Sequence, residues 1–210
     1  QVTFKPLAAG GPYTVNVQGK NKLQVKNVLM GDVWIAAGQS NMELPLRRVK
    51  YQYPDVIPST KLPDIREFNV PVVYHFKGPL EDFKQGQWKT AEPENLSNFS
   101  AVGFFFTRAL HEKYKVPIGL ITLPVGGSPA EAWVSESALQ KYPQFVEQLK
   151  PFKDDGFVEA TIASDKLSSG NWYSALGAKD EGLKGAWSNE VLDTKDWQDF
   201  QVPGYVKEQG

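Results

Sequence analysis

A serine between two amide side chains is the first group in this 210-residue sequence that could carry out chemistry. Gln39, Ser40 and Asn41 follow an apolar run, residues 33–37, that ends at Gly38. This run is too short for a helix of ordinary length, and it predicts a strand buried on both faces of a parallel sheet. Because α/β sheets bind ligands outside the carboxyl ends of their strands, Ser40 is a candidate nucleophile. The alternative is an ordinary turn, since Gly, Ser and Asn are common turn residues.

A glycine pair at the end of a second predicted strand strengthens the case for Ser40. Gly126 and Gly127 follow the apolar run 118–123, and neighbouring strands would bring them close to Ser40. Glycine lets the backbone approach a ligand closely and leaves an N–H free to point at it. A serine nucleophile needs such donors, because losing one from an oxyanion hole lowers the rate roughly 10²–10³-fold. Met42 excludes the Gly-x-Ser-x-Gly nucleophile elbow, and a plain turn is again the alternative for the glycines.

The elements that would position these residues alternate along the middle of the chain. Residues 100–114 have apolar side chains at helical spacing, with Ser100 as the N-cap and Pro117 as the stop signal. The second strand follows, and a further helix is predicted from 135 to 150 with an interruption near Pro143. The order strand, helix, strand, helix predicts an α/β fold with a parallel sheet and right-handed crossovers.

A long proline-rich stretch separates the nucleophile block from the predicted helix at Ser100. It contains one candidate strand, residues 65–73, which Pro71 would end or place at a sheet edge. Long irregular stretches in compact domains usually line a functional site or act as linkers. Because this stretch follows Ser40, we expect it to line the site.

The first and last segments of the sequence differ from the middle in the pattern of their apolar and polar residues. In residues 1–29, apolar and polar side chains alternate on either side of the turn 19–21, which predicts a hairpin. Two strands alone are marginal, so the hairpin is expected to be the end of a β domain whose earlier part is missing. Residues 154–210 contain scattered tryptophans without a helical period, and they are predicted to open a second β-rich module. The sequence therefore reads as a piece of a longer protein.

Composition narrows the classes of function. The 23 Lys and Arg residues nearly balance the 24 Asp and Glu residues, which gives no electrostatic reason to expect nucleic acid or an acidic membrane as a partner. The absence of Cys excludes disulfides, thiolate metal sites and cysteine catalysis. No run approaches ~18 consecutive apolar residues, so no membrane span is predicted. The sequence also contains no His-rich metal motif, Walker loop or dinucleotide fingerprint.

Two blocks resemble the sialate O-acetylesterases, a family of SGNH-type serine esterases related to carbohydrate acetyl esterases. Residues 31–34 (GDVW) and 38–43 (GQSNME) resemble the family's first signature block, and residues 126–133 (GGSPAEAW) resemble its second. Shorter stretches resemble the β modules that flank the family's hydrolase domain, at residues 10–13, 193–197 and 202–205.

The resemblance implies a fold and a compartment. The fold would be α/β, with the first part of a three-layer α/β/α SGNH-type hydrolase core over residues 30–153. The end of an N-terminal β domain would occupy residues 1–29, and the start of an inserted β-sandwich would occupy residues 154–210. No metal or organic cofactor is implied, and an esterase of this type acting on glycans would be periplasmic or secreted.

The resemblance also implies a reaction. Ser40 would be the nucleophile, and the backbone N–H groups of Ser40 and of Gly126 or Gly127 would form the oxyanion hole. The reaction would remove O-acetyl groups from sialic acid or another glycan sugar through an acyl-enzyme. The substrate partner would therefore be an acetylated glycan.

One essential part of that machinery has no counterpart in the sequence. In the family, an Asp-x-x-His motif supplies the general base and the carboxylate that orients it. His75 and His111 are the only histidines of this chain, and neither lies in such a motif. A serine without a base is a weak nucleophile. We therefore expect the catalytic His and Asp to come from a missing C-terminal segment or from a second chain.

Four residues near these motifs are candidate substrate-binding residues: Gln39, Asn41, Glu131 and Trp133. The last two would shape the acetyl pocket, and the alternative is a loop-anchoring carboxylate and a core tryptophan. A basic cluster just after the nucleophile would meet a sialate carboxylate or form a solvated face. It consists of Arg47, Arg48 and Lys50.

Two other functions remain open. The chain could be a non-catalytic carbohydrate-binding protein in which Trp172, Trp187 and Trp197 stack on sugar rings. It could also belong to an acetyl esterase that acts on acetylated plant polysaccharide. The reactivity of Ser40 would distinguish a carbohydrate-binding protein from an esterase. The sugar that an esterase accepts depends on loops, and the sequence of these loops does not indicate which sugar it is.

Overall fold

The structure is a computed structural model that describes residues 5, 7–188 and 193–208. The chain divides into two compact units, Gln1–Leu149 and Lys150–Gly210. None of the described helices is long and apolar enough to span a membrane.

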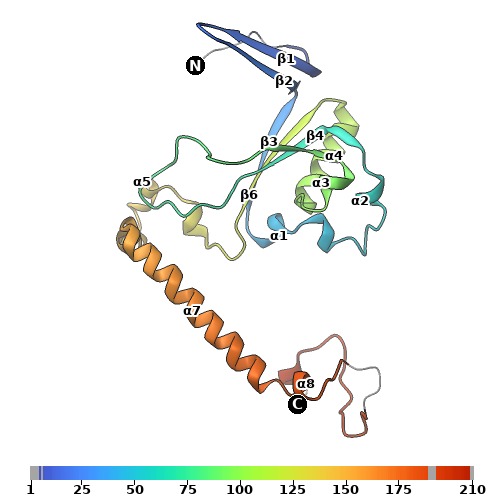
Figure 1. Cartoon of the computed structure of the whole chain (residues 1–210), viewed down its shortest axis with the longest axis vertical. Coiled ribbons are helices and arrows are strands. Elements are labelled where there is room, and N and C mark those ends of the chain that lie inside the picture. Colours follow the sequence, from blue (N-terminus) through green and yellow to red (C-terminus); the bar gives the residue numbers. More distant parts are fainter. Residues whose placement is uncertain (1–4, 6, 189–192, 209–210) are drawn as a thin grey trace. The chain divides into compact units, whose positions relative to one another are not determined.

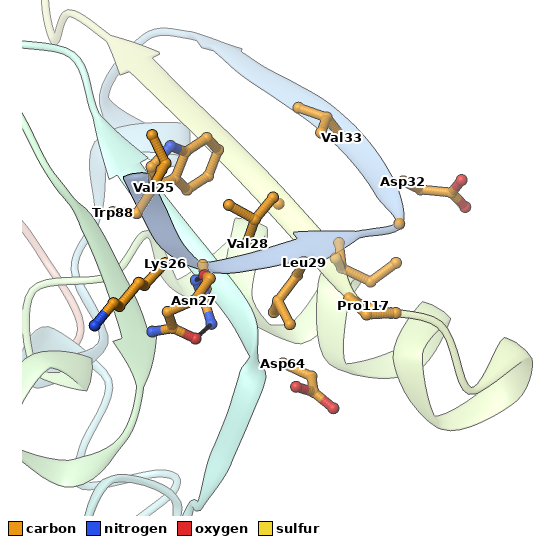
Figure 2. A pocket seen from close by; sticks show the side chains of 14 residues that line it. Val25, Lys26, Asn27, Val28, Leu29, Asp32, Val33, Asp64, Trp88 and Pro117 are labelled. Atoms are coloured by element: carbon orange, nitrogen blue, oxygen red, sulfur yellow. Dashed lines mark hydrogen bonds between the residues drawn. The ribbon is translucent and has the colours of Figure 1, made fainter. Parts of the chain in front are cut away.

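The first unit begins with the predicted hairpin. Strands β1 (Gly10–Gln18) and β2 (Lys22–Met30) pair antiparallel, with Val15 opposite Val25, as the alternating pattern predicts. Arg66 anchors the hairpin to the sheet, because its Nη1 and Nη2 each donate to Asn27, to the carbonyl and the Oδ1 respectively, at 2.7 Å. These residues line a pocket between the hairpin and the sheet, in which Figure 2 shows Asn27 and Trp88.

A mixed sheet follows with the strand order β3-β6-β4-β5 (Figure 1). Strand β3 (Asp32–Gly38) pairs parallel with β6 (Ile118–Pro124), which pairs parallel with β4 (Leu62–Asn69). The short strand β5 (Trp88–Ala91) closes the other edge antiparallel to β4. The α/β fold with parallel strands is confirmed, and the candidate strand near Pro71 is present but ends at Asn69. Strand β5 was not predicted.

Helix α4 (Ala101–Tyr114) lies against one face of the sheet, alongside β6 and β4. Its start is as predicted, since the Ser100 hydroxyl accepts a hydrogen bond from the N–H of Gly103 at 3.1 Å. Gly103 lets the helix approach the sheet, because a Cβ at this position would lie 2.6 Å from a methyl carbon of Leu120. The core on this face consists of Leu46, Ile65, Ala91, Leu96, Phe99, Ala101 and Phe104.

The strand at residues 33–37 was predicted to be buried on both faces, and this prediction is wrong for the face opposite α4. Val33 and Ile35 are 61% and 69% exposed, whereas Ala36 is buried. The reason is that β3 lies at the sheet edge and successive side chains point to opposite faces. Trp34 points toward α4 and meets Phe106 at 5.1 Å between ring centroids. No second helical layer covers Val33 and Ile35 in the described part of the chain.

Short helices account for the remaining regular structure of the first unit, and three of them interrupt the stretch that was predicted to be irregular, whose residues 70–87 form neither helix nor strand. The helix predicted near Pro143 is interrupted there as expected, and it forms α5 and α6. The short elements are α1 (Ser40–Glu43), η1 (Leu46–Arg48), α2 (Val56–Ser59), α3 (Pro93–Leu96), η2 (Ala130–Trp133), α5 (Glu136–Leu139) and α6 (Pro143–Leu149).

The second unit overturns the prediction of a β-rich segment after Asp154. Its main element is α7 (Asp155–Lys179), a helix of 25 residues, and the described residues of this unit contain no strand. Asp154 caps the helix by accepting a hydrogen bond from the N–H of Phe157 at 2.8 Å. The helix buries no side chain, so its sequence carries none of the periodicity that marks a packed helix. The other elements are η3 (Lys150–Lys153), α8 (Glu181–Lys184) and η4 (Val206–Glu208).

Candidate active site

Ser40 lies where the sequence predicts, immediately beyond the carboxyl end of β3, as the first residue of α1. Gly38 makes the turn with a φ of +143°, a conformation that side chains rarely adopt. The N–H of Val125 donates to the carbonyl of Gly38 at 2.9 Å, so the ends of β3 and β6 are joined directly. Ser40 is exposed, and its hydroxyl has no hydrogen-bond partner among the described residues. The hydroxyl is therefore accessible to a ligand.

Ser100 holds α1, the helix that begins at Ser40, in place from the start of α4. Its hydroxyl donates to the carbonyl of Met42 at 2.6 Å, and the next N–H, that of Ala101, donates to the carbonyl of Leu44 at 2.8 Å. Within α1, the N–H of Leu44 donates to the carbonyl of Ser40 at 2.9 Å. The short helix is thus fixed by contacts with α4 rather than by its own length, since a single turn is unstable alone.

The first residue of the glycine pair, Gly126, lies beside Ser40, as the order of the strands predicts. A Cβ built on Gly126 would lie 3.7 Å from the Cα of Ser40. The N–H of Gly126, however, donates to Oε2 of Glu43 at 2.7 Å. The N–H of Gly127 has no partner in the described part of the chain, and Gly127 has a φ of +77° that favours glycine. Of the two glycines predicted as oxyanion donors alongside Ser40, Gly127 is therefore the one with a free N–H.

The residues on either side of Ser40 have different roles in the structure. Nε2 of Gln39 donates to the carbonyl of Ser128 at 2.7 Å, so this side chain fastens the loop after β6 to the nucleophile turn. Asn41 is exposed, and its side chain makes no hydrogen bond with the described residues. Asn41 is thus available to a ligand, whereas the Gln39 Nε2 is already engaged.

Trp133 is not a core residue. Its Nε1 donates to the Ser128 hydroxyl at 2.9 Å, which in turn donates to the carbonyl of Val125 at 2.6 Å. The exposed indole lines an apolar pocket of 290 Å³ together with Val72 and Leu123, among others. Glu131 lies in η2, half-buried, and is not among the residues that line this pocket. The structure brings Trp133, but not Glu131, to a cavity near the nucleophile turn.

Part of the basic cluster lies beside Ser40. Ser40, Arg47 and Arg48 line one pocket of 250 Å³, together with Glu43. The Nη1 of Arg47 donates to Oδ1 of Asn98, which fixes this guanidinium. Lys50 does not line the pocket, and its ammonium group lies over the ring of Tyr51. Two of the three cations can therefore meet a negatively charged group near Ser40.

Glu67 is a buried carboxyl near the site that sequence reasoning missed. Its side chain is 5% exposed, and Oε1 accepts a hydrogen bond from the N–H of Ser100 at 3.1 Å. Burial raises the pKa of Glu67 to about 7, against the lowering effects of the Ser100 N–H, Thr122 and Lys89. The signal in the sequence was its place two residues after Ile65, on the same face of β4.

Neither histidine contacts Ser40. Nδ1 of His111 lies 2.7 Å from the carbonyl oxygen of Val116, which precedes the amino end of β6, whereas Ser40 lies at the carboxyl end of the sheet. Nδ1 of His75 lies 2.6 Å from the carbonyl oxygen of Gly78 in the loop between β4 and β5. The described residues also contain no cluster of three or more His, Asp or Glu that could hold a metal ion.

The chain is similar to known proteins over about two thirds of its length. A family model described as carbohydrate esterase, sialic acid-specific acetylesterase, matches residues 30–163. Sialate O-acetylesterase of Homo sapiens is 32% identical over 151 residues, which are 66% of this chain and 29% of that protein. The corresponding protein of Rattus norvegicus is 30% identical, over 66% and 28% of the two chains. The crystal structure of a carbohydrate acetylesterase from Xanthomonas citri matches with a TM-score of 0.61 and 40% identity, covering 65% of this chain and 31% of that chain.

Proposed function

This chain belongs to the carbohydrate esterase family of sialic acid-specific acetylesterases, and we propose that it carries the nucleophile of an enzyme that removes O-acetyl groups from glycan sugars. The observation that carries the proposal is the exposed Ser40 hydroxyl beyond the end of β3, next to Gly126, whose neighbour Gly127 has an unpaired N–H among the described residues. The chain spans less than a third of the length of these relatives, so the activity belongs to a larger assembly of residues.

In the proposed reaction, Oγ of Ser40 attacks the acetyl carbonyl carbon while a general base takes its proton. The negative charge that develops on the carbonyl oxygen is stabilised by the N–H groups of Ser40 and Gly127. The bond from the carbonyl carbon to the sugar oxygen then breaks, and the sugar oxygen takes the proton from the base. Water, activated by the same base, releases acetate from the acetylated Ser40.

The general base lies outside the described residues in this proposal. Neither His75 nor His111 contacts Ser40, and the relatives are more than three times as long as the matched region. We therefore assign the base and its orienting carboxylate to a His and an Asp that a further segment of the polypeptide, or a second chain, brings to Ser40.

The substrate and the compartment follow from the family and from local charge. Arg47 and Arg48 beside Ser40 support a sugar that carries a negative charge, such as sialic acid. Acetylated glycans of this kind are found outside the cytoplasm, which supports a periplasmic or secreted enzyme.

Reaction with a fluorophosphonate tests the proposed nucleophile in the full-length protein. We expect one adduct, mapped to Ser40 by peptide mass spectrometry, and we expect the Ser40→Ala variant to fold, to remain unlabelled and to release no acetate. Full esterase activity in Ser40→Ala would overturn the proposed function. A folded, full-length protein that neither labels nor hydrolyses an acetyl ester would favour the non-catalytic carbohydrate-binding alternative.

A further inference from the structure

A second, larger pocket lies directly beside the pocket that contains Ser40. It has a volume of 640 Å³ and is lined by five amide side chains, so we name it the amide pocket. The five are Asn69, Gln85, Gln87, Asn95 and Asn98. They come from β4, from the loop before β5 and from the end of the stretch that precedes α4. This gathering of amides was not visible in the sequence, because its members are spread over thirty positions.

The amide pocket is continuous with the nucleophile pocket. Glu43, Pro45 and Arg47 line both of them. An ester whose carbonyl carbon lies at Ser40 can therefore extend past Arg47 into the amide pocket without leaving the protein surface. The apolar pocket at Trp133 shares none of these residues.

The chemistry of the lining suits a hydroxyl-rich ring. An amide side chain offers two donors and a carbonyl acceptor, and a sugar hydroxyl both donates and accepts. The side chains of Gln85 and Gln87 make no hydrogen bond to any residue that the structure describes, so both groups are free. Asn98 uses its Oδ1 to hold Arg47, which leaves its two N–H donors for a ligand.

The floor and the charges of the pocket are fixed. Glu67 lies at its buried side, held by the N–H of Ser100, and the cationic Lys89 also lines the pocket. Asn69 is held by its Nδ2, which donates to the Thr122 hydroxyl at 3.2 Å. Because Glu67, Asn69 and Asn98 are already held, these groups lose less conformational entropy when a ligand binds than the free Gln85 and Gln87 side chains do.

We propose that the amide pocket is the subsite for the sugar ring of the ester substrate, with Gln85 and Gln87 as hydrogen-bonding partners of its hydroxyl groups. The proposal rests on the proposed function of Ser40 and deepens it, because it separates recognition of the sugar from reaction with the acetyl group. Gln85 and Gln87 are specificity-determining residues in this view and not catalytic ones.

The test compares two esters in the full-length protein. One is O-acetylated N-acetylneuraminic acid, and the other is 4-nitrophenyl acetate, which has an acetyl group but no sugar. We expect Gln85→Ala and Gln87→Ala each to raise KM for the acetylated sugar about threefold to tenfold, the equivalent of one hydrogen bond. We expect kcat/KM for 4-nitrophenyl acetate to stay within about twofold of wild type. The matched control is Gln144→Ala, on the exposed surface of α6, which should change neither constant.

Three outcomes of these assays decide whether the amide pocket is the sugar subsite. Selective loss with the sugar ester supports the subsite. An equal loss with both esters, or no loss with either, overturns it while leaving Ser40 as the nucleophile. If the wild-type protein hydrolyses neither ester, the proposed function fails instead, and calorimetric titration of O-acetylated N-acetylneuraminic acid into the Ser40→Ala protein still tests the subsite. Weaker binding after an added Gln87→Ala substitution supports it, and unchanged binding overturns it.

Discussion

The carboxylate of Glu43 accepts a hydrogen bond from the backbone N–H of Gly126 at 2.7 Å, and this bond joins the helix that begins at Ser40 to the loop after β6. The two residues are 83 positions apart in the sequence. A Cβ on Gly126 would lie 2.5 Å from Oε2 of Glu43, so the contact depends on glycine at this position. The placement of α1 against the loop that contains Gly126 and Gly127 therefore depends in part on this carboxylate.

We predict that Glu43 and Gly126 act as one unit. Glu43→Ala and Gly126→Ala should each lower kcat for 4-nitrophenyl acetate about tenfold, because each breaks a hydrogen bond to a charged group. The double variant should be no slower than the slower single variant, since both changes remove the same contact. Glu94→Ala, an exposed carboxylate of α3, is the control. Additive losses in the double variant would show that the two residues act independently.

Ser100→Ala should affect both stability and catalysis. The hydroxyl caps α4 and donates to the carbonyl of Met42, so its loss should lower the free energy of unfolding by about 1–2 kcal/mol and also lower kcat. Ser135→Ala removes the N-cap of α5 and serves as the control for a cap without a link to the nucleophile. It should leave kcat unchanged. Urea unfolding and steady-state kinetics measure the two effects, and a Ser100→Ala variant with wild-type kcat contradicts the positioning role.

The raised pKa of Glu67 predicts a pH-dependent stability. Burial raises this pKa from 4.5 to about 7, so the folded protein holds the proton more tightly than the unfolded chain does. The free energy of unfolding should therefore fall as the pH rises from about 4.5 to 7, by roughly 3 kcal/mol from this group. Glu67→Gln keeps an acceptor for the Ser100 N–H and should abolish that fall. Urea unfolding at several pH values measures it, and the same pH dependence in both proteins would show that other groups cause it.

The sequence was informative where a local pattern and tertiary packing agree. Helix α4 has a cap at Ser100 and an apolar face that the core uses, so its start was predicted correctly. The strand that leads to Ser40 was also predicted, but its burial was not, because Val33 and Ile35 lie at a sheet edge. The burial of a strand depends on which other elements cover it, and an apolar run in the sequence does not indicate those elements.

Two structural features could not be predicted from the sequence, and the reasons differ. Helix α7 buries no side chain, so the periodicity that identifies packed helices is absent from its sequence. The bond between Glu43 and Gly126 and the gathering of the amide pocket depend on the order of strands in the sheet. Contacts of this kind between distant positions leave no local signature, whereas Ser40 and the glycine pair were recognisable because each follows its own strand directly.

The exposed edge of β3 has a consequence for the colloidal behaviour of the 210-residue polypeptide in isolation. An edge strand with unpaired backbone groups and exposed Val33 and Ile35 is a template on which another copy can add a strand. Light scattering of this polypeptide should therefore increase with concentration, and Ile35→Lys, which places a charge at the edge, should improve its solubility. Aggregation of the isolated polypeptide will therefore have to be suppressed before its activity can be measured.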